Sequence, residues 1–240
     1  YPEGLKLPLV RMGMNIIPYS LNHDFSPSLK SIESLIEPNR IKVAFLIHYF
    51  GKSYDFGNVI ETLSSFDIYV IEDCAQSLFN YINREYKYKS VILYSFPKFL
   101  SVPSGALAVF NVDPESVLLP SEKANRKDSI IASFSVAMHK ISLIMRKIQR
   151  SATKEYIYIP VRFLASVFYI LYYKSLCLIK SSVPISRSAG EYLRYFDFNE
   201  FMELRSANYR FITENLTIHS KSDLMESEVN YLGYVIKTSP

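Results

Sequence analysis

The chain has 240 residues, of which 49% are apolar and 21% are charged. This ordinary balance excludes disordered, collagen-like and disulfide-framework classes. Its 7 glycines are scattered singly and its 2 cysteines lie far apart, so the sequence contains no glycine-rich nucleotide loop, cysteine metal cluster or CxxC redox pair. The net charge of +4 is uneven, because residues 121–180 carry 11 Lys and Arg against 3 Asp and Glu. That excess indicates either a solvated surface or an acidic partner.

The first half of the chain predicts an α/β fold. Residues 1–40 favour an extended entry and then a helix over 28–36, where apolar side chains share one face. Short, continuous apolar runs follow, separated by helix-sized segments such as 58–66. Such runs are typical of strands buried on both faces in a parallel or mixed sheet. The four predicted strands are 43–47, 68–71, 91–94 and 106–110.

The second half predicts helices. A basic amphipathic helix is expected over 129–148, a very apolar segment over 156–179 and a helix over 199–216, before a strand over 231–236. The uncharged run between Arg162 and Lys174 has 11 residues, fewer than the roughly 20 that span a bilayer. Three interpretations of 129–180 stay open: a buried or partner-facing helix, an interfacial helix on anionic lipid, and attraction of a sugar nucleotide's phosphates.

Polar side chains follow three consecutive predicted strands, and in parallel sheets ligands bind beyond the carboxyl ends of the strands. A carboxylate there beside a lysine is either a simple ion pair or a pair that holds a cofactor. In the second case the amine forms a Schiff base with a carbonyl, and the carboxylate keeps a pyridinium nitrogen protonated. The residues are His48, then Asp73 and Gln76, then Ser95 and Lys98.

Four stretches, 46–51, 70–77, 95–98 and 103–106, resemble in order and spacing the DegT/DnrJ/EryC1/StrS family. These fold-type-I enzymes use pyridoxal 5'-phosphate and are mostly aminotransferases that act on nucleotide-linked keto-sugars. The resemblance covers roughly residues 1–112, with a weaker echo from Arg205 to Leu216. It implies an α/β fold with a three-layer, mostly parallel sheet. It also implies three parts: a pyridoxal-phosphate-binding large domain (1–120), a basic and apolar helical segment (121–185) and the start of a small C-terminal domain (186–240).

The resemblance implies a role for each matching residue. Lys98 is the catalytic lysine, which binds the cofactor covalently and shuttles the proton between substrate and cofactor carbons. Asp73 faces the pyridine nitrogen, and Gln76 lies near the ring hydroxyl. Ser95 lies near the cofactor's oxygen or phosphate groups. The residues that would line the substrate site are His48 and Tyr49.

The chain departs from the family pattern around the lysine. The step from Ser95 to Lys98 is three positions where many members have five, and Phe99 replaces the usual asparagine. The family's phosphate-binding loop precedes the region where this chain begins. We therefore expect this chain to be a divergent segment of a longer enzyme, without the two ends of that enzyme. We expect no metal site.

As implied by the resemblance, the function would be amino transfer from an amino acid, glutamate above all, to a nucleotide-linked keto-sugar for polysaccharide, lipopolysaccharide or glycoconjugate synthesis. The protein would be a cytoplasmic homodimer, and we expect no binding to nucleic acid. A peripheral contact of residues 129–180 with a membrane is a further interpretation. A dehydrating relative is disfavoured by Lys98, since such members typically lose the lysine. A non-catalytic relative that serves as a binding or membrane-associated scaffold in polysaccharide assembly is the alternative.

Overall fold

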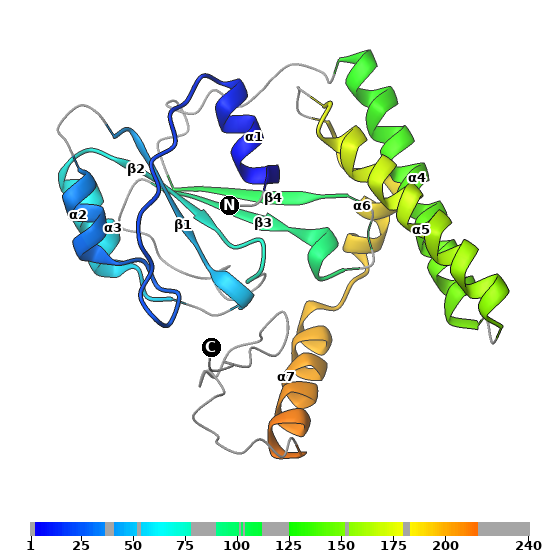
Figure 1. The fold of residues 1–240 in the computed structure, drawn as a ribbon. Coiled ribbons are helices and arrows are strands. Elements are labelled where there is room, and N and C mark those ends of the chain that lie inside the picture. Colours follow the sequence, from blue (N-terminus) through cyan, green and yellow to red (C-terminus); the bar gives the residue numbers. More distant parts are fainter. Residues whose placement is uncertain are drawn as a thin grey trace. The chain divides into compact units, whose positions relative to one another are not determined.

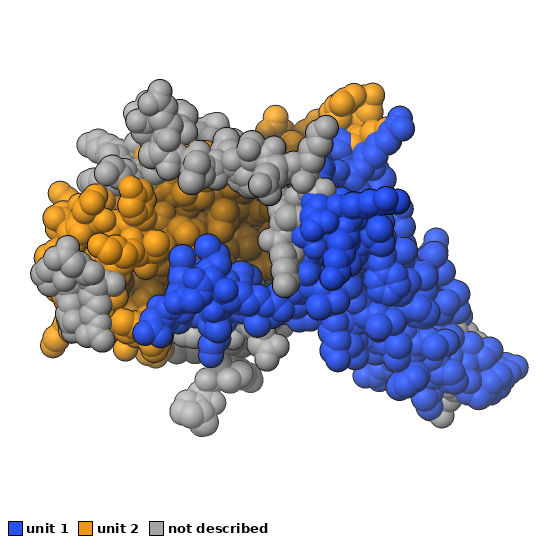
Figure 2. Space-filling model, turned by 90° about the horizontal axis from the view of Figure 1, so that it is seen from above, with its two compact units in different colours: residues 1–16, 118–190 blue, residues 17–117, 191–240 orange. Residues whose placement is uncertain are grey.

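The computed structural model describes residues 3–36, 41–51, 54–77, 90–100, 102, 104–111, 125–151, 154–179 and 183–215. The chain divides into two compact units, shown in different colours in Figure 2. Unit 1 comprises residues 1–16 and 118–190, and unit 2 comprises residues 17–117 and 191–240. Each unit is described by itself below.

Unit 2 is built on a four-stranded sheet in the order β1-β2-β3-β4 (Figure 1). β1 runs parallel to β2 and β2 runs parallel to β3, whereas β4 is antiparallel to β3. The predicted α/β fold with a mostly parallel sheet is confirmed. The strands are β1 (Val43–Ile47), β2 (Tyr69–Asp73), β3 (Ser90–Ser95) and β4 (Ala106–Asn111).

One face of this sheet, the helix-covered face, carries Leu46, Val70, Glu72 and Ile92. Two helices pack against this face: α2 (Leu29–Leu35) and α3 (Gly57–Ser65). The Ser28 hydroxyl begins α2 by accepting a hydrogen bond from the Ser31 N–H at 3.3 Å. Apolar side chains of both helices form one core with the first two strands: Ile32, Val59, Ile60 and Leu63 pack with Leu46 and Val70.

The opposite face of the sheet is less buried, because successive side chains along a strand point to alternate faces. Along β3 fully buried and half-buried residues alternate without exception. Along β2 the residues Ile71 and Asp73 are half-buried, and their neighbours Val70 and Glu72 are fully buried. The continuous apolar runs predicted strands that are buried on both faces. Among the described residues, only one face of the sheet is fully buried.

Unit 2 also contains α7 (Phe198–Asn215). The Asp197 carboxylate caps this helix by accepting hydrogen bonds from the N–H groups of Asn199 and Glu200 at 2.9 and 3.0 Å. Further along α7, the Arg205 guanidinium lies 5.5 Å from the centre of the Phe99 ring, next to Lys98 in the chain. Burial lowers the pKa of that guanidinium.

Unit 1 consists of helices (Figure 1). α4 (Arg126–Ser151) and α5 (Glu155–Leu176) form an antiparallel hairpin. α1 (Glu3–Arg11) belongs to the same unit, and its Arg11 guanidinium donates a hydrogen bond to the Cys177 carbonyl oxygen just beyond α5. The short helix α6 (Arg187–Arg194) begins in unit 1 and ends in unit 2.

The structure differs from the sequence-based predictions at the N-terminus. The expected extended entry is wrong, since residues 3–11 form α1. Pro8 lies inside this helix, where a proline removes a backbone donor and so disfavours a helix in a sequence pattern. The contact between Arg11 and Cys177 is tertiary and leaves no local signal. Residues 1–16 belong to the same compact unit as residues 118–190.

The remaining elements agree closely with the predictions. The four strands and the helices near 28–36, 58–66, 129–148 and 199–216 are present with boundaries shifted by a few residues. The apolar segment 156–179 is helical over most of its length. The division into parts over 1–120, 121–185 and 186–240 stays a prediction. The predicted strand over 231–236 lies outside the described residues.

Candidate functional site

The carboxyl ends of the three parallel strands meet at one edge of the sheet. Ile47 of β1 is in register with Asp73 of β2, and Asp73 is in register with Leu93 of β3. The residues that follow these positions therefore emerge at the same edge. The topology brings Asp73, Ser95 and the turn that contains Lys98 to the place where parallel sheets bind ligands.

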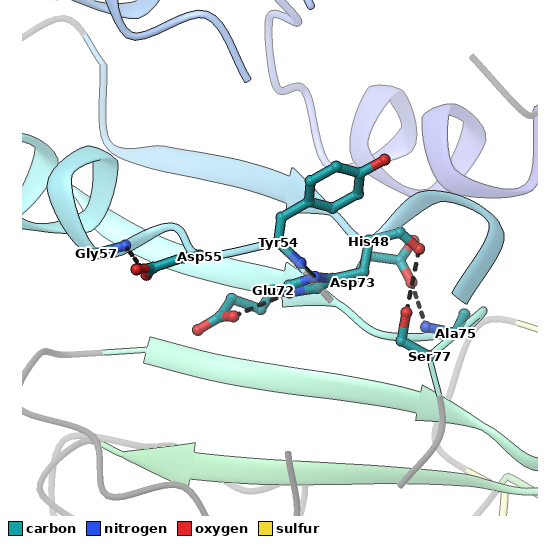
Figure 3. A network of polar contacts seen from close by, with 8 residues as sticks. All are labelled: His48, Tyr54, Asp55, Gly57, Glu72, Asp73, Ala75 and Ser77. Atoms are coloured by element: carbon teal, nitrogen blue, oxygen red, sulfur yellow. Dashed lines mark hydrogen bonds and ion pairs between the residues drawn. The ribbon is translucent and has the colours of Figure 1, made fainter. Parts of the chain in front are cut away.

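Asp73 is the last residue of β2 and is half-buried. Its Oδ1 atom accepts a hydrogen bond from the Ala75 N–H at 2.9 Å (Figure 3). The turn orients the Asp73 carboxylate, because the backbone N–H two residues further along the chain donates to it. The second carboxylate oxygen has no partner among the described residues. Asp73 therefore offers one oriented, negatively charged oxygen at the edge of the sheet.

Gln76 connects the turns that follow β1 and β2. Its Oε1 atom accepts a hydrogen bond from the Phe50 N–H at 2.7 Å. Phe50 has φ of 60°, in the left-handed region that non-glycine residues rarely adopt, so this bond supports a strained position. Tyr49, which precedes Phe50, is half-buried in the same short helix. Because its oxygen is engaged, Gln76 keeps its amide N–H groups for a ligand.

Ser95 and Lys98 lie on either side of a tight turn. Ser95 ends β3 and is half-buried, and the next three residues form a short 3-10 helix, Phe96–Lys98. The turn is tied to the start of β4, because the Phe96 N–H donates to the Gly105 carbonyl oxygen at 3.1 Å. Gly105 has φ of 131°, a conformation in which a side chain would be strained. Lys98 is exposed, so its amine is accessible from solvent.

His48 forms a buried pair with Glu72 (Figure 3). Both side chains are fully buried, and His48 Nε2 lies 3.2 Å from Glu72 Oε2. The Tyr54 N–H donates to His48 Nδ1 at 3.3 Å, so Nε2 carries the ring proton and donates to the carboxylate. The histidine ring also packs against Phe56, with ring centres 4.3 Å apart.

This pair lies on the helix-covered face, whereas Asp73 lies on the opposite face of the same strand as Glu72. The position of His48 therefore favours a structural role over the predicted lining of a substrate site. Glu72 was missed by sequence reasoning. The available signal was an acidic residue directly after the apolar run 68–71 and before Asp73, since a carboxylate buried there requires a partner. Its Oε1 atom has no hydrogen-bond partner among the described residues.

Among the described residues no group of three or more His, Cys, Asp or Glu side chains could hold a metal ion.

Comparison with known proteins finds a similarity that covers the first three strands of the sheet. The sequence model of the DegT/DnrJ/EryC1/StrS aminotransferase family matches residues 8–96. Over these residues the chain is similar to that family. Asp73, Gln76 and Ser95 lie inside the matched segment, and Lys98 follows it by two positions. The family's cofactor is pyridoxal phosphate.

A solved structure of 3-amino-5-hydroxybenzoic acid synthase is 19% identical to this chain, with a TM-score of 0.36. The similarity covers 44% of this chain, and the chain spans only 28% of the length of that structure. No protein with a curated description matches the chain.

The residues at the sheet edge fit pyridoxal phosphate. The cofactor needs an anion at its ring nitrogen, hydrogen-bond partners at its oxygens and an amine at its carbonyl carbon. The oriented carboxylate of Asp73 fits the first requirement, the amide of Gln76 and the hydroxyl of Ser95 fit the second, and the exposed amine of Lys98 fits the third.

Proposed function

We propose that the protein is a pyridoxal-phosphate-dependent aminotransferase that moves an amino group from glutamate to a nucleotide-linked keto-sugar for polysaccharide or glycoconjugate synthesis. The family match over residues 8–96 supports this reaction class. The observation that carries the proposal is Asp73, whose carboxylate is oriented by the Ala75 N–H at the edge where Ser95 and Lys98 emerge.

Asp73 acts by its charge in this proposal. When bound, pyridoxal phosphate supplies an electron sink for the charge that develops at the substrate carbon. A carboxylate beside the ring nitrogen keeps a proton on that nitrogen, because an adjacent negative charge favours the protonated, cationic form. The bond from Ala75 prevents the carboxylate from rotating away, so its charge is in place before the reaction begins.

Lys98 would hold the cofactor's carbonyl carbon through its amine, with loss of water, and its amine, once displaced by the amine of the substrate, would be free to carry the proton between the substrate carbon and the cofactor carbon. Its exposure leaves the amine accessible, and the tie between Phe96 and Gly105 limits the motion of the turn. Ser95, half-buried at the strand end, would hold an oxygen of the cofactor by its hydroxyl. Gln76 would donate from its amide to the ring hydroxyl, since the Phe50 N–H already engages its carbonyl oxygen.

The resemblance to the family supports the sugar substrate, the glutamate donor, a homodimer and a cytoplasmic site of action for the sheet unit. The test is a half-reaction in the absence of sugar. The protein loaded with pyridoxal phosphate should convert glutamate to 2-oxoglutarate in an amount equal to the bound cofactor, and the absorbance of the bound cofactor should change. A nucleotide-linked keto-sugar should then restore the absorbance that the cofactor had before glutamate was added. Lys98→Ala should abolish both steps, whereas Lys42→Ala, an exposed lysine before β1, should leave them intact. Loading without any keto acid product would contradict the proposal.

A second candidate function is a non-catalytic, membrane-associated scaffold in polysaccharide assembly. The observation in its favour is the exposed apolar surface of the α4–α5 hairpin. The half-reaction separates the two candidates, because a scaffold would show no turnover although Asp73 and Lys98 are intact.

A further inference from the structure

The hairpin of α4 and α5 exposes large apolar side chains along both helices. Among the described residues these are the two helices long and apolar enough to cross a membrane. Only 17% of the most apolar window of α4 and 11% of that of α5 is buried, whereas the core helix of a soluble protein is mostly buried. The exposed residues include Ile130, Phe134, Ile144, Ile148, Ile159, Phe163, Leu164, Ile170 and Leu171.

Polar groups, in contrast, lie in the seam between the two helices. The hydroxyl groups of Ser135 and Ser175 are 2.6 Å apart and share a hydrogen bond. The Ser142 hydroxyl donates to the Ala165 carbonyl oxygen at 2.9 Å. The fully buried side chains of the hairpin are all small or polar: Asp128, Ser135, Ser142, Ala165 and Ser175.

Three rings and a guanidinium also form contacts between the two helices. The His139 and Tyr172 rings lie with centres 4.7 Å apart, and the Arg146 guanidinium lies 5.1 Å from the centre of the Tyr169 ring. The buried side chains between the helices are thus small or polar, the apolar side chains of Ile131, Met138 and Phe168 are half-buried, and large apolar side chains are exposed on the backs of both helices. A hairpin stabilised in water instead buries large apolar side chains at its contact, because burial of apolar surface is what drives its packing.

Small residues and hydrogen-bonding hydroxyls at the helix contact are typical of helices that associate in lipid, where no hydrophobic driving force exists between them. The outward stripes lie on the backs of both helices. In α4, Ile130, Phe134, Ile144 and Ile148 recur at helical spacing and lie away from the seam stripe of Ser135 and Ser142. A single protein partner would cover one side of the hairpin, whereas a lipid phase covers both.

The dimensions and charges of the hairpin also suit a bilayer. At about 1.5 Å per residue, the 26 residues of α4 and the 22 of α5 extend about 39 and 33 Å, against a hydrocarbon core of about 30 Å. Basic residues lie toward both ends of the helices: Arg126 and Lys127 begin α4, Lys174 is in the last turn of α5 beside the level of Ser135, and Arg146, Lys147, Arg150 and Lys154 lie near the connection between the helices.

Two further basic residues, Lys140 and Arg162, lie between these ends and are exposed. Their long apolar stems let their charges extend toward the headgroups while the stems stay among acyl chains. The excess of positive charge matches the negative surface of anionic lipids.

We infer that α4 and α5 form a membrane-embedded hairpin whose apolar backs contact the acyl chains of a bilayer and whose basic ends contact anionic headgroups. This inference extends the peripheral contact expected from residues 129–180, and it does not rest on the proposed aminotransferase activity.

The test compares two matched double variants of the whole protein. Phe163→Asp with Ile170→Asp changes residues 68% and 50% exposed on α5, seven positions apart. Phe211→Asp with Leu204→Asp changes residues 66% and 57% exposed on α7, also seven positions apart. Each protein is prepared with vesicles of phosphatidylcholine and phosphatidylglycerol and centrifuged in a density gradient, in which vesicles float and aggregates sink. The floating fraction is then washed with alkaline carbonate.

The wild type and the α7 variant should float and resist the carbonate wash, and the α5 variant should lose roughly tenfold or more of its floating fraction, since a carboxylate within the acyl layer is strongly disfavoured. Lys98→Ala should float like the wild type even if it lacks activity, which separates this result from that of the enzyme assay. The inference is overturned if the wild type stays soluble without detergent, either as a monomer or as an oligomer of this chain, if carbonate releases it, or if both double variants float equally.

Discussion

His48 donates a hydrogen bond from Nε2 to Glu72 Oε2 across 3.2 Å, with both side chains fully buried. The pair links His48, the residue directly after β1, to Glu72 of β2, and Glu72 directly precedes Asp73 in that strand. On the same strand, therefore, one carboxylate stabilises the core beneath the sheet and the adjacent one is presented on the other face. A shift of β2 by one residue would move each of these two carboxylates to the opposite face of the sheet.

Removal of Glu72 should destabilise the sheet unit. We expect Glu72→Ala to lower the free energy of unfolding by about 1–3 kcal/mol, because it leaves the buried His48 Nε2–H without its acceptor. Glu72→Gln should cost less, since its amide oxygen can still accept from Nε2. Chemical denaturation followed by circular dichroism measures both. Glu61→Ala, at an exposed position of α3, is the control and should change the value by no more than about 0.5 kcal/mol.

Asp73→Asn isolates the charge of the carboxylate from its geometry. The asparagine oxygen can still accept from the Ala75 N–H, so the turn and the fold should persist. Loss of the negative charge should lower the rate of amino transfer by about 10² or more, the scale on which preorganised electrostatic groups act. Steady-state kinetics with cofactor in excess measures this effect. A rate within twofold of the wild type would show that Asp73 does not face the ring nitrogen.

Gln76→Ala should affect the turn after β1 before it affects the chemistry. The Phe50 N–H would lose its acceptor, and this residue already has a positive φ. We expect a stability loss of about 1 kcal/mol, typical of one hydrogen bond near the surface. The cofactor's dissociation constant should also rise. Gln76→Glu keeps an acceptor for Phe50 but removes the amide donor, so it should restore stability without restoring affinity.

Ser142 tests the close approach of the hairpin helices. Its side chain is buried and donates to the Ala165 carbonyl oxygen, so Ser142→Leu should force α4 and α5 apart and lower the stability of the hairpin by about 1–3 kcal/mol. Thermal unfolding in detergent, followed by helical circular dichroism, reports the change. Ser166→Leu, at an exposed position of α5, should be tolerated. Equal effects of the two substitutions would mean that the seam is not closely packed.

Much of the sheet unit could be predicted from the sequence, since its strands are short apolar runs such as 43–47 with polar residues directly after them. Parallel strands also place their carboxyl ends together, which is why Asp73 and Ser95 could be assigned to one edge. The side of the sheet on which a residue lies is harder to predict. His48 and Asp73 both follow apolar runs, yet they lie on opposite faces because the alternation of each strand decides this.

Unit 1 could be predicted only in part. The helices of the hairpin follow from apolar spacing, but the hydrogen bonds between them come from serine hydroxyls, and Ser135 and Ser175 have no sequence signature of contact. A count of uncharged residues between Arg162 and Lys174 argued against insertion. The distribution of exposed apolar side chains over two paired helices argues for it, and that distribution exists only once the hairpin is folded.

The central claim is that Lys98 carries the cofactor of an aminotransferase, and chemical trapping tests it most directly. The protein is incubated with pyridoxal phosphate, reduced with borohydride, digested and analysed by mass spectrometry. We predict that the mass of the reduced cofactor is found on the peptide containing Lys98, and that Lys98→Ala loses it while Lys42→Ala retains it. Cofactor mass spread over several exposed lysines, or unchanged labelling in Lys98→Ala, would contradict the account.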